Sequence, residues 1–184
     1  MRPLPRRSPA CFIWSSLLLF ACNSDTASLV GAKTLPPKAE LMRETIDIYQ
    51  WNQNNDLDFL RYELLPNDDV KIAHLRRALG GDRKISEEMV RLSPHTAIEL
   101  RHKLWRLRPA ELGGLGQAVY PVDCTPPVDS GIQASVAFVK SDASIGVFLL
   151  PLDCNASESR ETRRIVFDVI NSIQKNRAPA PIQS

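Results

Sequence analysis

The residues best placed for chemistry are His95, Glu99 and His102, which follow one another at spacings of four and three. In a helix these spacings put the three side chains on one face, and two imidazoles with a carboxylate could hold zinc. The order differs, however, from the His-Glu-x-x-His pattern of a zinc protease. The same face also continues to Arg106, a cation that opposes a metal ion nearby. We therefore predict a solvated polar face, with Glu99 paired to Lys103, and no bound metal; zinc is the alternative.

Two other motifs match catalytic or phosphate-binding loops only in part. Ser130 in Asp129-Ser130-Gly131 lacks the Gly-x-Ser-x-Gly surroundings of a nucleophile elbow. The run Gly113-Gly114-Leu115-Gly116 precedes an expected strand, whereas a phosphate loop leads into a helix. The sequence therefore predicts no catalytic residue and no cofactor. The arginines that could gather near an anion are interpreted as solvated surface: Arg101, Arg106, Arg108, Arg160, Arg163 and Arg164.

Residues 1–22 have the pattern of a bacterial secretory signal. Three arginines within positions 2–7 precede an apolar run over 12–21, and no acidic residue precedes Asp25. The segment Leu19-Phe20-Ala21-Cys22 resembles the lipobox of bacterial lipoproteins, although Phe20 departs from the usual small or β-branched residue. The resemblance implies cleavage before Cys22 and acylation of its thiol, with palmitate as the expected modification. An ordinary signal cleaved elsewhere and an uncleaved anchor are the alternatives, and the apolar run covers about half of the roughly 20 residues that span a bilayer.

The residue after Cys22 bears on the membrane in which the chain is held. Asn23 takes the position at which lipoproteins retained in the inner membrane carry Asp. The resemblance therefore implies the outer membrane, with the protein facing the periplasm.

The charge balance changes when the expected signal is removed. Residues 1–21 contain three of the 23 Lys and Arg and none of the 21 Asp and Glu, so the remaining 163 residues carry a net charge of −1. The basicity of the full sequence thus belongs to the signal. Nucleic-acid binding loses its main support, because that function needs a basic surface.

Cys124 and Cys154 are the cysteines that remain in the body of the exported chain. Two cysteines in an oxidising compartment predict a disulfide; a metal site is the alternative, without a nearby His or third Cys to support it. Each cysteine ends a Pro-(Val/Leu)-Asp-Cys segment, at a constant offset of 30. We interpret this repeated segment as the similar ends of two strands. The alternative is an acidic site formed by Asp123 and Asp153.

The expected fold is α+β, with a helical N-terminal half followed by a small β-sheet and a C-terminal helix. The expected divisions are a signal peptide (1–21), a lipidated tether (22–38), a helical region (39–112), a sheet plus helix (113–175) sharing one domain with it, and a disordered tail (176–184). In the helical region, apolar residues from Leu41 to Tyr49 share a helical face. A second helix stacks Ile72, Leu75 and Leu79 and ends at Gly80-Gly81. Ser93-Pro94 starts a third helix, which runs to about residue 107.

The second half predicts strands over 117–122, 132–140 and 145–152, then a helix that follows a capping box at 155–158 and ends near Lys175. In a simple meander the outer strands lie about 9.6 Å apart, too far for a disulfide between them. Either the two strands that end in cysteine are parallel neighbours, or the cysteines lie beyond the sheet. Pro121 and Pro151 favour the second arrangement, because proline prefers strand ends.

Without a catalytic set, the sequence favours a binding role. We expect a periplasm-facing lipoprotein that acts as a binding or accessory subunit of an envelope system, such as an immunity or secretion-system component, with a protein partner in the periplasm. The alternative is an envelope hydrolase with a divergent active site. A deep pocket with converging polar groups would favour the enzyme, and an exposed apolar patch or protruding loop would favour the binding protein.

Overall fold

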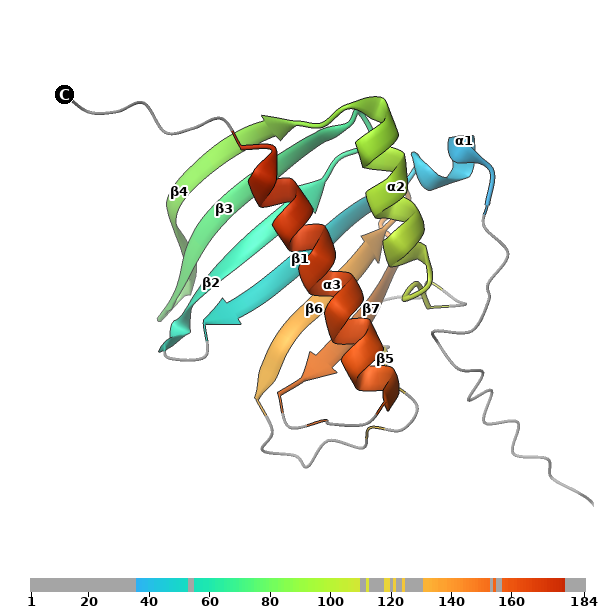
Figure 1. Cartoon of the computed structure of the whole chain (residues 1–184). Coiled ribbons are helices and arrows are strands. Elements are labelled where there is room, and N and C mark those ends of the chain that lie inside the picture. Colours follow the sequence, from blue (N-terminus) through green and yellow to red (C-terminus); the bar gives the residue numbers. More distant parts are fainter. Residues whose placement is uncertain are drawn as a thin grey trace, which may run out of the picture.

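A computed structural model describes residues 36–52, 55–109, 112, 118–119, 121, 124, 131–152, 154 and 157–177. Seven strands form one sheet in the order β4-β3-β2-β1-β6-β7-β5, with helices lying against it (Figure 1). Every neighbouring pair is antiparallel except β5 and β7. The elements are α1 (Lys38–Leu41), β1 (Thr45–Asn52), β2 (Asn55–Leu64), β3 (Asp69–Ala78), β4 (Gly81–Arg91), α2 (Pro94–Trp105), β5 (Ala118–Val119), β6 (Ile132–Val139), β7 (Ile145–Pro151) and α3 (Ser157–Lys175).

The predicted helical N-terminal half is wrong. Apart from the short α1, residues 45–91 form a four-stranded antiparallel meander. The apolar residues expected to share a helical face fall on opposite faces of β3, where Ile72 packs into the core and Leu75 points the other way. Gly80 and Gly81, interpreted as a helix end, form the β3–β4 turn at φ 101° and 124°. Both angles lie in the region that glycine adopts at least cost.

The prediction for α2 and for the second half of the chain is largely confirmed. Ser93 caps α2, since its Oγ accepts a hydrogen bond from the Thr96 amide at 3.1 Å. The helix α3 buries the expected apolar stripe of Ile165, Val166, Val169, Ile170 and Ile173. Because β1 pairs with β6, the sheet joins the two halves of the sequence.

The strands next to the cysteines settle the question of topology. β5 and β7 are parallel neighbours, with Ala118 opposite Val147, and β6 lies on the other side of β7. Both expected arrangements therefore occur together, because the strands are parallel neighbours and Cys124 and Cys154 lie beyond the ends of β5 and β7. Cys124 and Cys154 form the predicted disulfide, with Cα atoms 5.8 Å apart.

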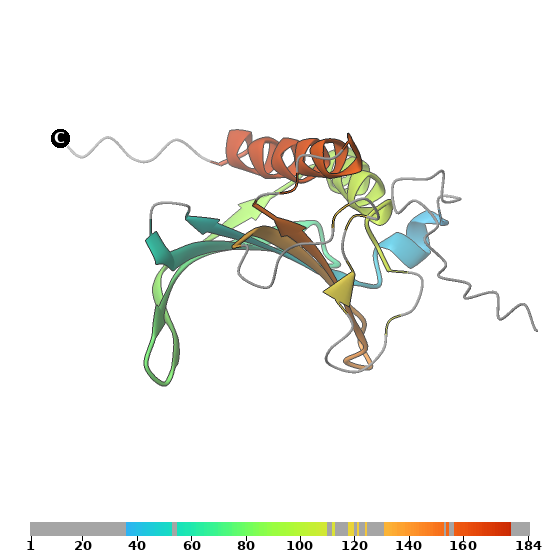
Figure 2. The ribbon, with the colours of Figure 1, turned by 90° about the horizontal axis from the view of Figure 1, so that it is seen from below.

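One face of the sheet is covered and the other is not. Helices α2 and α3 pack against each other on the same side of the sheet (Figure 2). Beneath them lies the core, which includes Ile48, Val136 and Phe148, each 0% exposed. The sheet arches towards the helices, and the β3–β4 and β6–β7 hairpins bend away from them (Figure 2). The described part of the chain thus leaves a concave face without a helix over it.

Candidate functional site

The concave side of the sheet, which we call the open face, gathers aromatic and charged side chains. Strand side chains alternate between the two faces, and Ile46 and Ile48 of β1 belong to the helix-covered core. The side chains between and after them therefore point to the open face. Strand pairing places the other members of the face in register. Its central members are Asp47, Tyr49, Trp51, Phe59, Arg61, Glu63, Lys71, Ala73 and Met89.

Three aromatic rings form a compact cluster on the open face. The centroids of Tyr49 and Trp51, two positions apart on β1, are 6.0 Å apart. Phe59, opposite Trp51 on β2, lies 6.1 Å from each of them. The guanidinium of Arg61 stands 5.7 Å from the Tyr49 ring centroid, in cation–π contact. These contacts fix the orientation of the rings before any ligand arrives.

The charges beside the aromatic cluster compensate one another. Arg61 donates hydrogen bonds to both carboxylate oxygens of Asp47, at 3.1 and 2.9 Å. Glu63 lies 3.6 Å from Arg61 and 2.7 Å from Lys71. Burial raises the pKa of Asp47, although the hydrogen bonds from Arg61 oppose this shift. Two acids and two bases leave the centre of the open face electrically neutral.

Apolar groups remain exposed at the margin of the open face. Leu57 on β2 is 53% exposed and Met89 on β4 is 56% exposed. Large apolar groups left in contact with water are candidates for burial by a partner. The open face thus combines an aromatic centre with apolar side chains that are more than half exposed in the described part of the chain.

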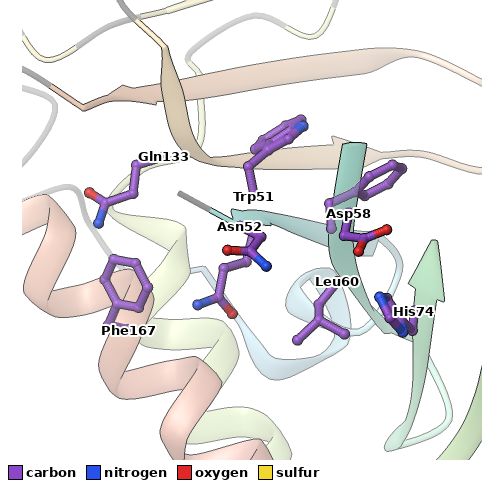
Figure 3. A pocket seen from close by; sticks show the side chains of 9 residues that line it. Trp51, Asn52, Asp58, Leu60, His74, Gln133 and Phe167 are labelled. Carbon is purple, nitrogen blue, oxygen red and sulfur yellow. The ribbon is translucent and has the colours of Figure 1, made fainter. Parts of the chain in front are cut away.

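A cavity of about 490 Å³ lies where β1 ends, beside β2 and α3. Figure 3 shows Phe167 of α3 and Gln133 of β6 facing each other at one end, with His74 of β3 at the other. Gln133 Oε1 is buried without a hydrogen-bond partner in the described structure. The lining residues are Gln50, Trp51, Asn52, Asp58, Phe59, Leu60, His74, Gln133 and Phe167.

The carboxamides of the cavity can hold a neutral polar group. The three carboxamides donate and accept hydrogen bonds but do not titrate. Asp58 is engaged by Arg76 at 2.6 and 3.1 Å, and these hydrogen bonds lower the pKa of its carboxyl group. The described lining includes no Ser or Cys to act as a nucleophile. The cavity is therefore suited to a small neutral molecule with an N–H or O–H donor for Gln133.

The histidine cluster is spread along the surface of α2. His95 and Glu99 are exposed and His102 is half-buried. Glu99 forms the predicted ion pair with Lys103 at 3.1 Å. Within the described ranges, no three His, Cys, Asp or Glu side chains lie together as a metal site. The absence of bound zinc in the protein itself stays a prediction.

Of the arginines predicted on the solvated surface, Arg101 is instead buried and Arg108 is half-buried. Arg101 is 1% exposed and donates hydrogen bonds to the backbone carbonyls of Leu41, Glu44, Leu64 and Leu65, at 2.7 to 3.0 Å. Burial lowers the pKa of Arg101 to about 10, so the guanidinium keeps its charge at neutral pH. Arg108 pairs with the buried Glu44. Neither arginine is available to an anion, because both connect α2 to the start of the sheet.

Several predicted features lie outside the described residues. They are the signal and Cys22, the tether up to residue 35, the Gly113–Gly116 run, Asp123, Asp153, Ser130 and the tail from residue 178. In the part of the chain that is described, no helix has both the length and the apolar content to cross a membrane.

Sequence reasoning did not find the open face. A signal was present, since Tyr49 and Trp51 are two positions apart and so lie on one face of a strand. It was obscured by the helical interpretation of the same segment. The chain was also compared with models of protein families and with curated proteins, and neither comparison finds a match.

Proposed function

We propose that this chain is a lipid-anchored binding protein of the bacterial envelope, whose open face holds an apolar helical segment of a partner protein. The observation that carries the proposal is the cluster of Tyr49, Trp51 and Arg61, supported by the buried Phe59, on a face that no helix of the described chain covers. Tyr, Trp and Arg are the residues most enriched among those that dominate binding energy at protein interfaces. Here they are already ordered by contacts with one another, which lowers the entropy cost of binding.

The form of the partner follows from the two edges of the sheet. An added strand needs a free edge. At one edge, β4 carries charged residues and an irregular register opposite His74 and Leu75, and both features discourage pairing. At the other edge, β5 is two residues long. A partner is therefore held by side chains across the open face, and a helix presents such a row of side chains on one stripe.

The chemistry of the partner follows from the neutral centre. Asp47, Arg61, Glu63 and Lys71 already form ion pairs with one another. A charged group laid over them would lose hydration without gaining a counter-ion. The segment that fits is apolar where it meets Trp51 and Met89. The membrane anchor in this proposal is the acylated Cys22. It holds the protein at the outer membrane, with the body of the protein facing the periplasm.

Site-directed crosslinking tests the binding face. A photoreactive benzoylphenylalanine is introduced at Met89, on the open face, and in a second strain at His95, which is exposed on α2. Irradiation of living cells should join one protein to position 89 and not to position 95, and the crosslinked peptide should be apolar and helical. Trp51→Ala should weaken binding of that peptide at least about 30-fold, as expected for the loss of a dominant contact.

Two results would contradict this part of the proposal. One is an equal yield of the same product at positions 89 and 95, since these lie on opposite sides of the sheet. The other is a bound peptide whose affinity Trp51→Ala leaves unchanged.

The anchor is tested by mass. Full-length protein expressed in a Gram-negative host should gain the mass of an acylated cysteine after loss of residues 1–21. The Cys22→Ala variant should remain uncleaved or be released from the membrane fraction. Wild type and variant with the same lipid-free mature mass would rule out the lipoprotein. The envelope hydrolase stays an alternative prediction, and an activity that survives Trp51→Ala would favour it.

A further inference from the structure

The β3–β4 turn projects from the sheet with an apolar residue at its tip. We call residues 76–84 the finger; they bend away from the helices at one corner of the molecule (Figure 2). Leu79 at the tip is 108% exposed, more than in the extended reference state, and is the most exposed of the large apolar residues in the described chain. Gly80 and Gly81 account for the turn through their positive φ angles. The geometry of the turn therefore does not require Leu79, and no residue that the structure describes covers its side chain.

Basic residues surround the apolar tip on both strands. Arg76 and Arg77 precede the turn and Arg83 and Lys84 follow it, with Asp82 as the single acid of the finger. The finger thus carries a net charge of +3, although the chain without residues 1–21 has a net charge of −1. Arg76 forms an ion pair with Asp58, and Lys84 forms one with Glu87. Among the described residues, neither Arg77 nor Arg83 has an ion-pair partner, and both are exposed.

A role in protecting the sheet edge explains only part of this pattern. Charged side chains on an edge strand prevent pairing with another sheet, and β4 is an edge. That role does not call for an exposed leucine, which itself promotes association. An apolar tip flanked by cations is complementary to a surface that has anionic groups on the outside and an apolar layer beneath them.

We propose that the finger inserts into a membrane surface rich in anionic phospholipids, with Leu79 among the upper acyl carbons and the arginines at the phosphates. Arg77 lies two residues from Leu79, which corresponds to about 7 Å along a strand, and Arg83 lies opposite Arg76, three residues or about 10 Å from Leu79. Amphipathic elements at membrane surfaces bury their apolar side about 5–10 Å deep. The cations are distributed over both strands, so an end-on approach to a flat anionic surface uses all of them, whereas one wall of a protein pocket would not.

This contact is separate from the acylated Cys22 and from the open face, although the preference for a membrane over an acidic protein rests partly on the proposed anchor. A single acyl chain gives only reversible attachment, and a second, basic contact makes it stable. Both hairpins bend to the same side of the sheet (Figure 2). A finger in the lipid surface would therefore turn the open face towards partner segments close to the membrane.

The test uses the mature chain, residues 22–184 with Cys22→Ser, which keeps every described residue and removes the site of acylation. Its binding is measured by co-sedimentation with phosphatidylcholine vesicles and with vesicles containing about one third phosphatidylglycerol. The mature chain should bind the anionic vesicles and not the neutral ones. Because each basic residue contributes about fivefold in affinity at such a surface, Arg83→Glu should weaken binding about 25-fold. Leu79→Ser should weaken it at least about tenfold, through the loss of apolar burial.

Matched controls separate the finger from general charge and hydrophobicity. Arg91→Glu makes the same charge change at the other end of β4, where the side chain is 78% exposed. Met89→Ser removes an exposed apolar group outside the finger, whose side chain is 56% exposed. Each control should change vesicle binding less than about threefold, since it lies about 27 Å or more along β4 from the turn, well beyond the screening length of about 10 Å.

Three outcomes would overturn the proposal: no preference for anionic vesicles, equal losses for the finger and control variants, or Leu79→Ser binding as tightly as wild type. A different partner is indicated if the mature chain does not bind vesicles and Leu79→Ser and Arg83→Glu each abolish the protein crosslink from position 89. In that case the finger binds an acidic protein. Variants are compared only when their urea unfolding midpoints match that of the parent chain. The vesicle result is independent of the proposed function, because the Met89 crosslink and the mass of Cys22 are measured separately.

Discussion

Glu44 and Arg108, 64 residues apart in the sequence, form a bidentate ion pair at the junction of the sheet and α2. The Arg108 Nη2 lies 2.7 Å from Glu44 Oε1, and Nε lies 2.9 Å from Oε2. The side chains are 12% and 6% exposed. The guanidinium also stands 4.7 Å from the ring centroid of Trp105. Glu44 precedes β1 and Arg108 follows α2, so the pair connects the start of the sheet to the end of the helix.

Removing one partner of this pair should be costly. Glu44→Ala would leave a mostly buried guanidinium without its carboxylate, and we expect a loss of about 3–5 kcal/mol in the free energy of unfolding. Urea denaturation measures the change. Glu99→Ala is the matched control, because its pair with Lys103 is exposed and contributes less than about 1 kcal/mol. Equal losses for the two variants would contradict the structural role of Glu44.

Arg101 should be as sensitive as Glu44, even to a conservative change. Its guanidinium satisfies four backbone carbonyls from α1, the α1–β1 connection and the end of β2. The ammonium group of lysine cannot reach four acceptors in this planar arrangement, and each buried carbonyl left unpaired costs about 1–3 kcal/mol. Arg101→Lys should therefore lower the free energy of unfolding by about 3 kcal/mol or more. Arg77→Lys, at an exposed position on β3, should change it by less than about 0.5 kcal/mol.

The second half of the chain was predictable because its local signals agree with one another. Ser93 and Pro94 mark the start of α2, and the five-residue apolar stripe of α3 repeats with helical spacing. The strands 132–139 and 145–151 are rich in β-branched and apolar residues and are separated by a polar turn. Local preference and tertiary packing point to the same elements here.

The first half was misinterpreted because its apolar spacing is compatible with two structures. Leu41, Thr45 and Ile48 fit a helix, yet Ile46 and Ile48 alternate with Asp47 and Tyr49 as they do in a half-covered strand. β4 gave almost no signal, because it is an edge strand exposed over most of its length. Two consecutive glycines between extended runs are a hairpin signal, and Gly80-Gly81 was interpreted as a helix end. The open face depends on pairing across β1, β2 and β3, which no local pattern specifies.

The open face should also give the protein a distinctive pH dependence. Burial raises the pKa of Asp47 in the folded protein above its usual value of 3.8, so the folded state holds this proton more tightly than the unfolded state. The contribution of Asp47 to stability therefore decreases as the pH rises from below 3.8 through the folded pKa. Asp47→Asn lacks this contribution. Its free energy of unfolding, relative to wild type, should increase over the same pH range and then level off.

Urea denaturation at a series of pH values between about 3 and 7 measures this difference. Glu161→Gln serves as the control of opposite sign, because hydrogen bonds from Arg164 lower the pKa of Glu161. Relative to wild type, that variant should lose stability as the pH rises. A constant difference between Asp47→Asn and wild type across the range would refute the raised pKa of Asp47.

The disulfide should contribute strongly to stability, because it closes a long loop and anchors the start of α3. Cys124 and Cys154 are 30 residues apart, and a loop of that length corresponds to about 3–4 kcal/mol in the chain-entropy estimate. The Cys154 carbonyl also accepts hydrogen bonds from Ser159 at 2.9 Å and from Arg163 at 3.3 Å. Cys124→Ser should therefore lower the Tm by about 10 °C. Cys154→Ser and the double variant should each give the same decrease, since all three lose a single shared bond. A double variant with twice the loss of either single variant, or two free thiols titrated in the native unreduced protein, would show that the two cysteines act independently.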